Sequence, residues 1–174
     1  MITNYFGAEP NVVRQSALGS EMDELDSAIV RELQRDARQS NRDIARKVGV
    51  APSTSLERIR LLRERGVIRG YHADIAPSAL NRGVQALVSV QVRPLSRGVI
   101  DAFKAFAAQL PEVLSVFVMA GSDDFVIHVS AQDNEHLHAF LVDRLSQRKE
   151  IVGFRTSIIF QHLAKHDPAP LPAP

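Results

Sequence analysis

The spacing of apolar residues changes at Val84 from a purely helical period to one that includes strands, and that change constrains the fold more than any other feature. Over residues 23–64 apolar side chains recur every three or four positions, which is the period of a helix. From Val84 to Val92 they alternate, so that Val84, Ala86, Val88, Val90 and Val92 share one face of a strand. We therefore expect a helical block followed by a mixed block, which together make an α+β protein.

The helical block predicts three short helices whose ends carry recognisable residues. Asp23 is placed to cap the first helix and Ser40 the second, while Gly49 suits the left-handed position that ends the second. Pro52 occupies the first position of the third helix, where its missing N–H costs nothing. Two short helices joined by a three-residue turn are typical of a helix-turn-helix.

The third helix is expected to stop at Gly66, with Leu56, Ile59 and Leu62 facing the core. After it, residues 67–75 are predicted to form a short strand or an extended wing. The N-terminal block is therefore expected to be a winged helix-turn-helix domain.

The mixed block predicts four strands and two helices in a definite order. Strands are expected at 84–92, 113–120, 125–131 and 152–163, and helices at 99–110 and 135–145. The order β-α-β-β-α-β is that of a ferredoxin-like domain, an antiparallel sheet with both helices on one face. Over the whole chain we expect an N-terminal extension (1–21), the helix-turn-helix domain (22–70), a linker (71–83), the ferredoxin-like domain (84–164) and a Pro-rich tail (165–174).

Positive charge is concentrated in the helix-turn-helix region. The chain carries a net charge of +1, but residues 46–70 contain seven basic and two acidic side chains. A basic segment on a near-neutral chain indicates a polyanion-binding surface, and the alternative is a solvated helix face. In a DNA-binding helix-turn-helix the second helix enters the major groove, where arginine binds guanine and hydroxyls bind bases or phosphates. The candidate contacts with double-stranded DNA are Arg42, Ser53, Thr54, Glu57, Arg58 and Arg60.

A second candidate site is the turn between the two middle strands. Gly121 permits unusual backbone angles, and exposed amides there, with the hydroxyl of Ser122 or Ser157, suit a carboxylate. Asp123 or Asp124 suits an ammonium group, so the turn that ends at Phe125 offers partners for both charges of a free amino acid. The alternative is an ordinary turn.

Several chemistries are excluded or unsupported. The chain has no cysteine, which excludes disulfides, thiolate metal sites and a thiol nucleophile. Its six histidines are scattered, and no phosphate loop, dinucleotide fingerprint or nucleophile elbow is present. No run approaches the roughly 20 apolar residues of a membrane span, and no secretory signal is visible. We expect a cytoplasmic protein without metal, cofactor or membrane contact.

The two blocks together resemble the Lrp/AsnC, or feast/famine, family of regulators. The resemblance covers residues 22–163 and rests on Ile44-Ala45, Val48-Gly49, Arg58-Ile59, Pro111-Glu112-Val113 and the Gly121-x-x-Asp124-Phe125 turn. It implies a transcriptional regulator whose C-terminal domain forms dimers, with octamers of four dimers as the common assembly. It also implies a free amino-acid effector bound near residues 121–125, with Ser157 at a position where threonine is common.

Two departures from the family pattern lie in the third helix. Ala51 stands where a serine N-cap is usual, and Ser55 stands where an apolar residue is preferred, which predicts a slightly rotated helix. Two alternative functions accompany the resemblance. One is a nucleoid-architectural protein with little sequence preference, and the other is an enzyme like the siroheme decarboxylases, which share both domains.

Overall fold

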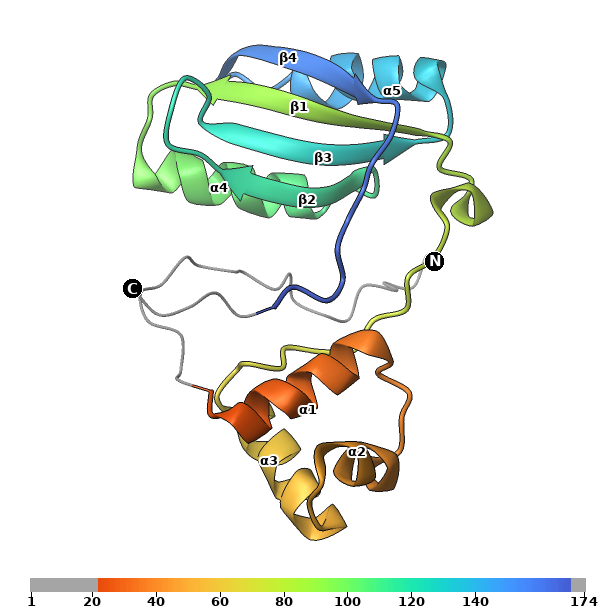
Figure 1. Cartoon of the computed structure of the whole chain (residues 1–174). Helices are drawn as coiled ribbons and strands as arrows, with labels where there is room; N and C mark the ends of the chain where they lie inside the picture. Colours follow the sequence, from red (N-terminus) through yellow and green to blue (C-terminus); the bar gives the residue numbers. More distant parts are fainter. Residues whose placement is uncertain (1–21, 170–174) are drawn as a thin grey trace, which may run out of the picture. The chain divides into compact units, whose positions relative to one another are not determined.

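The computed structural model describes residues 22–169, which divide into two compact units (Figure 1). One unit contains residues 22–73 and 163–169, and the other contains residues 74–162. The extension 1–21 and the end of the tail, 170–174, lie outside the described residues. Within residues 22–169 no helix is long and apolar enough to cross a membrane.

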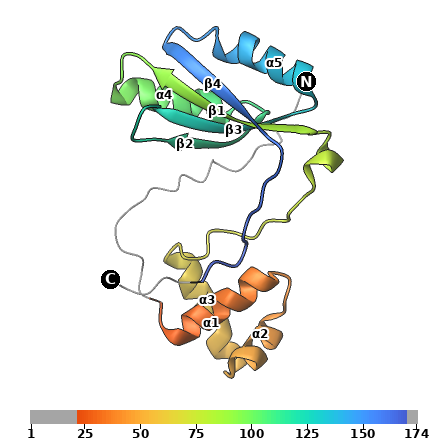
Figure 2. The same ribbon diagram turned by 45° about the horizontal axis from the view of Figure 1, so that its top comes forward.

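The N-terminal unit consists of the three predicted helices, α1 (Glu24–Arg35), α2 (Asn41–Val48) and α3 (Pro52–Glu64) (Figure 2). Their caps are those expected. The Asp23 carboxylate accepts the amide of Asp26 at 2.7 Å, and Ser40 Oγ accepts the amide of Asp43 at 3.1 Å. Gly49 ends α2 with φ 75°, a left-handed angle that suits glycine. A small core formed by Ile29, Ile44 and Leu62 holds the three helices together.

The strand predicted at residues 67–75 does not form. The amides of Val67 and Ile68 both bond to the carbonyl of Leu62, at 2.9 and 3.1 Å, so the chain folds back on the end of α3. Val67 and Ile68 then pack against the helical core rather than pairing with another strand. The sequence predicted either a short strand or an extended wing here. Residues 69–75 agree with an extended segment, and this segment has no regular secondary structure.

The C-terminal unit has the predicted ferredoxin-like architecture, so the α+β fold class is confirmed. A single 3-10 turn, η1 (Pro77–Leu80), precedes it and was not expected. The sheet has the order β2-β3-β1-β4 with every neighbouring pair antiparallel. Its elements are β1 (Val84–Val92), α4 (Arg97–Ala108), β2 (Val113–Val118), β3 (Phe125–Ala131), α5 (Asn134–Phe140), the π-helical turn η2 (Leu141–Leu145) and β4 (Ile151–Ile159).

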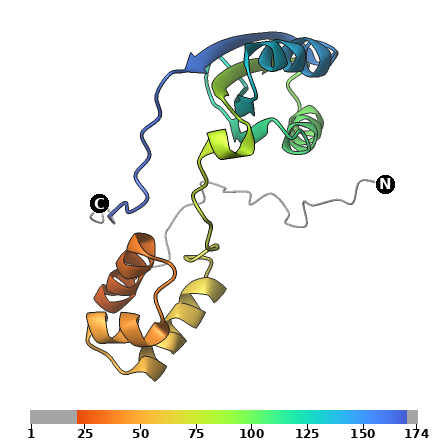
Figure 3. The same ribbon diagram turned by 90° about the vertical axis from the view of Figure 1, so that its right-hand side faces the viewer.

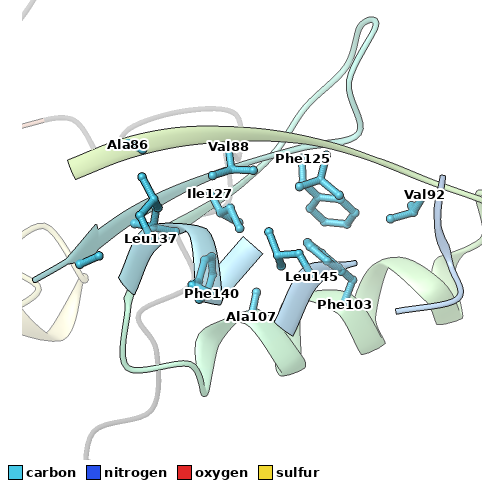
Figure 4. Packing of buried hydrophobic residues seen from close by; sticks show 13 residues of the cluster. Ala86, Val88, Val92, Phe103, Ala107, Phe125, Ile127, Leu137, Phe140 and Leu145 are labelled. Carbon is cyan, nitrogen blue, oxygen red and sulfur yellow. The ribbon is translucent and has the colours of Figure 1, made fainter. Parts of the chain in front are cut away.

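Both helices cover the same face of this sheet, and the core lies between them and the strands (Figures 3 and 4). The even-numbered positions of β1 from 86 to 92 are completely buried, as their alternation predicts. Phe103 of α4 meets Phe125 of β3 with ring centroids 4.4 Å apart, and Leu137 and Phe140 of α5 complete the cluster. Each such side chain stabilises the fold by about 1.5–3 kcal/mol.

Two strand ends differ from the sequence prediction for one geometric reason. β4 ends at Ile159 because its pairing partner there is Gln85, at the beginning of β1. Phe160, within the predicted strand 152–163, lies beyond the last paired residue and is 99% exposed. In the same way β2 ends at Val118, which pairs with Phe125 at the beginning of β3. The predicted helix 135–145 is also divided, because α5 passes into η2 after Phe140.

The C-terminal segment returns to the N-terminal unit. Gln34 Nε2 of α1 donates a hydrogen bond to the carbonyl of Pro168 at 3.4 Å. A hollow of about 390 Å³ lies between α1 and residues 167–169. The first part of the predicted tail therefore belongs to the same compact unit as the three helices.

Candidate DNA-binding helix and effector site

Arg58, predicted to contact DNA, is directed at α1. Its Nη1 lies 2.6 Å from Asp23 Oδ2 and 3.2 Å from Asp26 Oδ1. Asp26 is buried, and its second oxygen accepts a hydrogen bond from Arg65 at 2.6 Å. The amide of Asp26, and then Arg58, hold the pKa of Asp23 below its ordinary value. Arg58 therefore links α3 to α1, and its contact with DNA stays a prediction.

Arg60 lies on the outer face of α3 between two glutamates. Its guanidinium is 2.6 Å from Glu57 Oε1 and 2.5 Å from Glu64 Oε1. The hydrogen bond from Arg60 lowers the pKa of Glu57, so this predicted contact carries a negative charge at neutral pH. All three side chains are exposed, and ion pairs of this kind are weak enough to exchange partners.

The remaining predicted DNA contacts are exposed. Ser53 and Thr54 lie in the first turn of α3, and Arg42 lies in the first turn of α2. The turn between these helices is held by Asn41, whose Nδ2 donates to the carbonyl of Pro52 at 2.7 Å. Ala51 is the N-cap residue of α3 and supplies no side-chain hydrogen bond, as its identity predicts.

Two adjacent residues of α3 contradict the sequence prediction. Leu56 was expected in the core and is 59% exposed, whereas Ser55 is completely buried. The helix is thus not rotated to bury the leucine, and Ser55 keeps the inward position. Leu62, also on the inner face, fixes this orientation because it packs against Ile29 and Ile44. Ser55 Oγ has no hydrogen-bond partner among the described residues.

The sequence analysis did not identify Leu56 and Arg63 as side chains on the exposed face of α3. Both are exposed, and they lie seven residues apart on one side of α3. The spacing from Arg60, four and three residues respectively, was the available signal.

The turn between β2 and β3 separates the roles of its two aspartates. Asp124 Oδ2 accepts the amide of Val92 at 2.8 Å and pairs with Arg93 at 3.0 Å. The backbone of Asp124 also closes the turn, because its carbonyl accepts the amide of Met119 at 2.9 Å. Oδ2 of this carboxylate therefore joins the turn to the end of β1.

Asp123 instead faces a hollow of about 180 Å³ at the end of the sheet. Its Oδ2 lies 2.7 Å from Arg155 Nη2, and Gln91 Nε2 donates to the carbonyl of Ser122 at 2.8 Å. The hollow is lined by Ser89, Gln91, Asp123, Gly153, Phe154 and Arg155. It therefore presents an acid, a base and amide groups within a space suited to a small molecule.

The other predicted effector residues are spread around this hollow. Gly121 and Ser122 are exposed in the turn. Ser157 is exposed on β4, on the same face of the sheet as Arg155 and two residues from it. Phe125 is different, because its side chain is completely buried in the core against Phe103.

Arg155, Gln91 and Ser89 were missed by sequence reasoning. Ser89 pairs with Arg155 in the register of β1 and β4, and Gln91 is the next residue on that face. The alternation of β1 placed Ser89 and Gln91 opposite its buried valines, so that signal was present. The pairing of Arg155 with Ser89 required the register of the sheet. Within residues 22–169 no group of three acidic or histidine side chains is arranged to hold a metal ion.

Comparison with known families agrees with this architecture. Residues 22–63 match the AsnC-type helix-turn-helix domain, and residues 85–169 match the Lrp/AsnC ligand binding domain. The chain therefore belongs to the Lrp/AsnC family of transcriptional regulators. It is a DNA-binding regulator with a ligand-binding domain and is not an enzyme of the siroheme decarboxylase type.

Individual relatives are similar over nearly their whole length. The HTH-type transcriptional regulator AldR of Mycolicibacterium smegmatis is 43% identical over 148 residues, which are 85% of this chain and 86% of that protein. The crystal structure of AldR from Mycobacterium tuberculosis has a TM-score of 0.71 and 37% identity, with 86% of this chain and 99% of that chain covered. A Neisseria meningitidis regulator, crystallised in complex with L-methionine, has a TM-score of 0.77 and 27% identity and covers 83% of this chain and 94% of its own.

Proposed function

We propose that this protein is an amino-acid-responsive transcriptional regulator that acts as a homo-oligomer and controls genes of amino-acid metabolism. Its α3 helix binds double-stranded DNA, and a free amino acid binds in the hollow beside Asp123. A regulator of this kind acts on the chromosome, which places it in the cytoplasm.

The observation that carries the effector proposal is the pair formed by Asp123 and Arg155 at the rim of the hollow. An amino acid has an ammonium and a carboxylate, and the two side chains offer each of them a partner of opposite charge. Gln91 and Ser89 add hydrogen-bonding groups on the same face of the sheet as Arg155. The Neisseria relative was crystallised with L-methionine, which supports the same ligand class here.

The face of the sheet opposite its helices supports self-association. Leu87 and Phe117 are exposed there, and Val126, which pairs with Phe117, lies between them. A sheet with one uncovered apolar face is stabilised when a second sheet covers it. A second copy of this chain offers the same face, so we propose a dimer as the basic unit and four dimers as the assembly.

Oligomerisation connects ligand binding with DNA binding. Several linked helix-turn-helix domains bind DNA with a higher effective concentration than one, and their spacing selects the spacing of half-sites. An effector that binds one assembly or domain arrangement more tightly shifts the population toward it. DNA affinity then follows effector concentration.

A thermal-shift screen of the common amino acids tests the effector proposal. The cognate amino acid raises the unfolding midpoint of the full chain, because it binds the folded state. Asp123→Asn weakens that binding by about tenfold, since it removes a charged partner of the ammonium group. Asp143→Asn is the matched control, because Asp143 is exposed on η2, on the other face of the sheet. A midpoint that no amino acid raises, or equal binding by both variants, would contradict the proposal.

DNA footprinting tests the proposed sequence-specific DNA binding. The regulator protects selected sites more strongly than random duplexes, whereas the nucleoid-architectural alternative predicts equal protection of both. DNA affinity also falls steeply with salt concentration, because arginines displace counterions from phosphates.

A further inference from the structure

The adjacent residues Ser55 and Leu56 of α3 have the opposite burial to the one that would stabilise the helix best. Leu56 is 59% exposed, while Ser55 is completely buried with its hydroxyl unpartnered among the described residues. Burial of a leucine is favourable, and burial of a hydroxyl without a hydrogen bond is unfavourable. The helical unit is thus less stable than it would be with a buried leucine and an exposed serine. Such a loss of stability is typical of positions at which a functional requirement determines the residue type.

The surroundings of Leu56 indicate what that function is. Ser53 and Arg60 lie one helical turn away on either side, and Arg63 lies a further turn along the same face. These neighbours are hydroxyl and guanidinium donors, which suit bases and phosphates rather than a protein core.

Leu56 is also alone. Within residues 22–70 no other large apolar side chain is exposed. A protein partner docking here would need an apolar patch, which this surface lacks. A single apolar group surrounded by donors instead matches the edge of a base pair that carries one apolar group.

We propose that Leu56 is a specificity-determining residue that contacts the 5-methyl group of thymine in the major groove. That methyl is the apolar group that the major-groove edges of the four base pairs present, so an apolar side chain there selects thymine. This inference rests on the proposed DNA binding by α3, whose N-terminal half contains Leu56.

The test uses a duplex selected by the full-length wild-type protein from a random DNA pool. Each thymine of the half-site is then replaced by deoxyuridine, which removes the methyl and keeps the base pairing. At one thymine position the replacement lowers the DNA-binding affinity of the wild-type protein by roughly fourfold, the effect expected for one buried methyl. Leu56→Ala binds the thymine duplex less tightly by at least as much and binds both duplexes equally.

Leu80→Ala is the matched control. Leu80 ends η1 in the other unit and is 58% exposed, so the same truncation is made at equal exposure away from α3. It retains the wild-type discrimination between thymine and deoxyuridine.

The possible results separate this inference from the function on which it rests. If deoxyuridine weakens Leu56→Ala as much as the wild type at every position, or weakens neither, the thymine contact is refuted while DNA binding stands. If the wild type enriches no sequence from the pool, specific DNA binding and the inference fail together. The wild-type comparison of the two duplexes needs no variant, so a folding defect in Leu56→Ala would not obscure the answer.

Discussion

Arg58 of α3 donates a hydrogen bond to Asp26 of α1 across 3.2 Å, and this carboxylate is only 2% exposed. A buried acid that loses a partner is destabilised, even though Arg65 still binds its second oxygen. The basic residues of α3 therefore divide into those that hold the helices together and those on the outer face.

Arg58→Ala is expected to lower the free energy of unfolding of the helical unit, because the buried carboxylate of Asp26 loses a hydrogen bond from a charged partner. Hydrogen exchange of the α1 and α3 amides measures this locally. Arg60→Ala, whose partners Glu57 and Glu64 are exposed, is the control and changes exchange little. If the two variants exchange at the same rate, the link to Asp26 contributes no stability.

Ala51→Ser is expected to stabilise α3 by about 1 kcal/mol, because a serine hydroxyl at the N-cap accepts an orphan amide of the first turn. The unfolding midpoint of the full chain in urea detects the change. Ala37→Ser, at an exposed position in the turn before α2, is the comparison and leaves the midpoint in place. A midpoint that falls for Ala51→Ser would place the helix boundary elsewhere.

Ser55→Ala is expected to raise the free energy of unfolding by about 1 kcal/mol. It removes a buried hydroxyl that has no partner among the described residues and replaces it with the best helix former. Urea unfolding followed by circular dichroism gives the value. Ser53→Ala, at an exposed position two residues earlier in the same helix, separates the burial effect from helix propensity. A loss of stability in Ser55→Ala would show that the hydroxyl is hydrogen-bonded in solution.

Leu87→Glu combined with Phe117→Glu is expected to dissociate the oligomer, because two carboxylates on the open face of the sheet cannot be buried without partners. Sedimentation velocity reports the mass of the species in solution. Leu95→Glu adds a charge at an exposed leucine between β1 and α4 and leaves the assembly intact. An unchanged mass for the double variant would move the interface to another surface.

The free energy of unfolding is expected to decrease as the pH is lowered, because His128 becomes protonated. Burial, and then the nearby His162, lower the pKa of His128 below its ordinary 6.5, while its Nε2 lies 2.9 Å from Gln85 Oε1. The unfolded chain binds the proton more readily than the folded chain, so this contribution is complete above about pH 6.5 and is lost as pH falls toward the folded pKa. His128→Gln therefore shows a smaller loss of unfolding free energy between about pH 7.5 and 5.5 than the wild type. His138→Gln, at an exposed position of α5, retains the wild-type difference.

Local signals in the sequence predicted the elements well. Ser40 and Gly49 bound α2 because each satisfies backbone groups at a helix end, and the alternation of β1 identified its buried face. These features depend on residues close together in the chain.

Features that depend on distant residues were not predictable in the same way. The inward position of Ser55 is fixed by the packing of its helix against α1 and α2, and an apolar pattern assigns Leu56 to the core instead. Asp123 and Asp124 are adjacent and chemically identical, and only the positions of Arg155 and Val92 decide which faces the hollow. The partners of Arg58 lie more than 30 residues earlier in the sequence.

The return of residues 163–169 to the α1 surface means that the chain crosses between its two units twice. The helical unit is therefore not one uninterrupted stretch of sequence, and a fragment ending at residue 73 would lack the hydrogen bond that Pro168 accepts from Gln34 of α1. The second crossing reaches α1 through a hydrogen bond and not through a covalent link, so a cut between residues 73 and 74 leaves the three helices attached to residues 163–169 by non-covalent contacts alone.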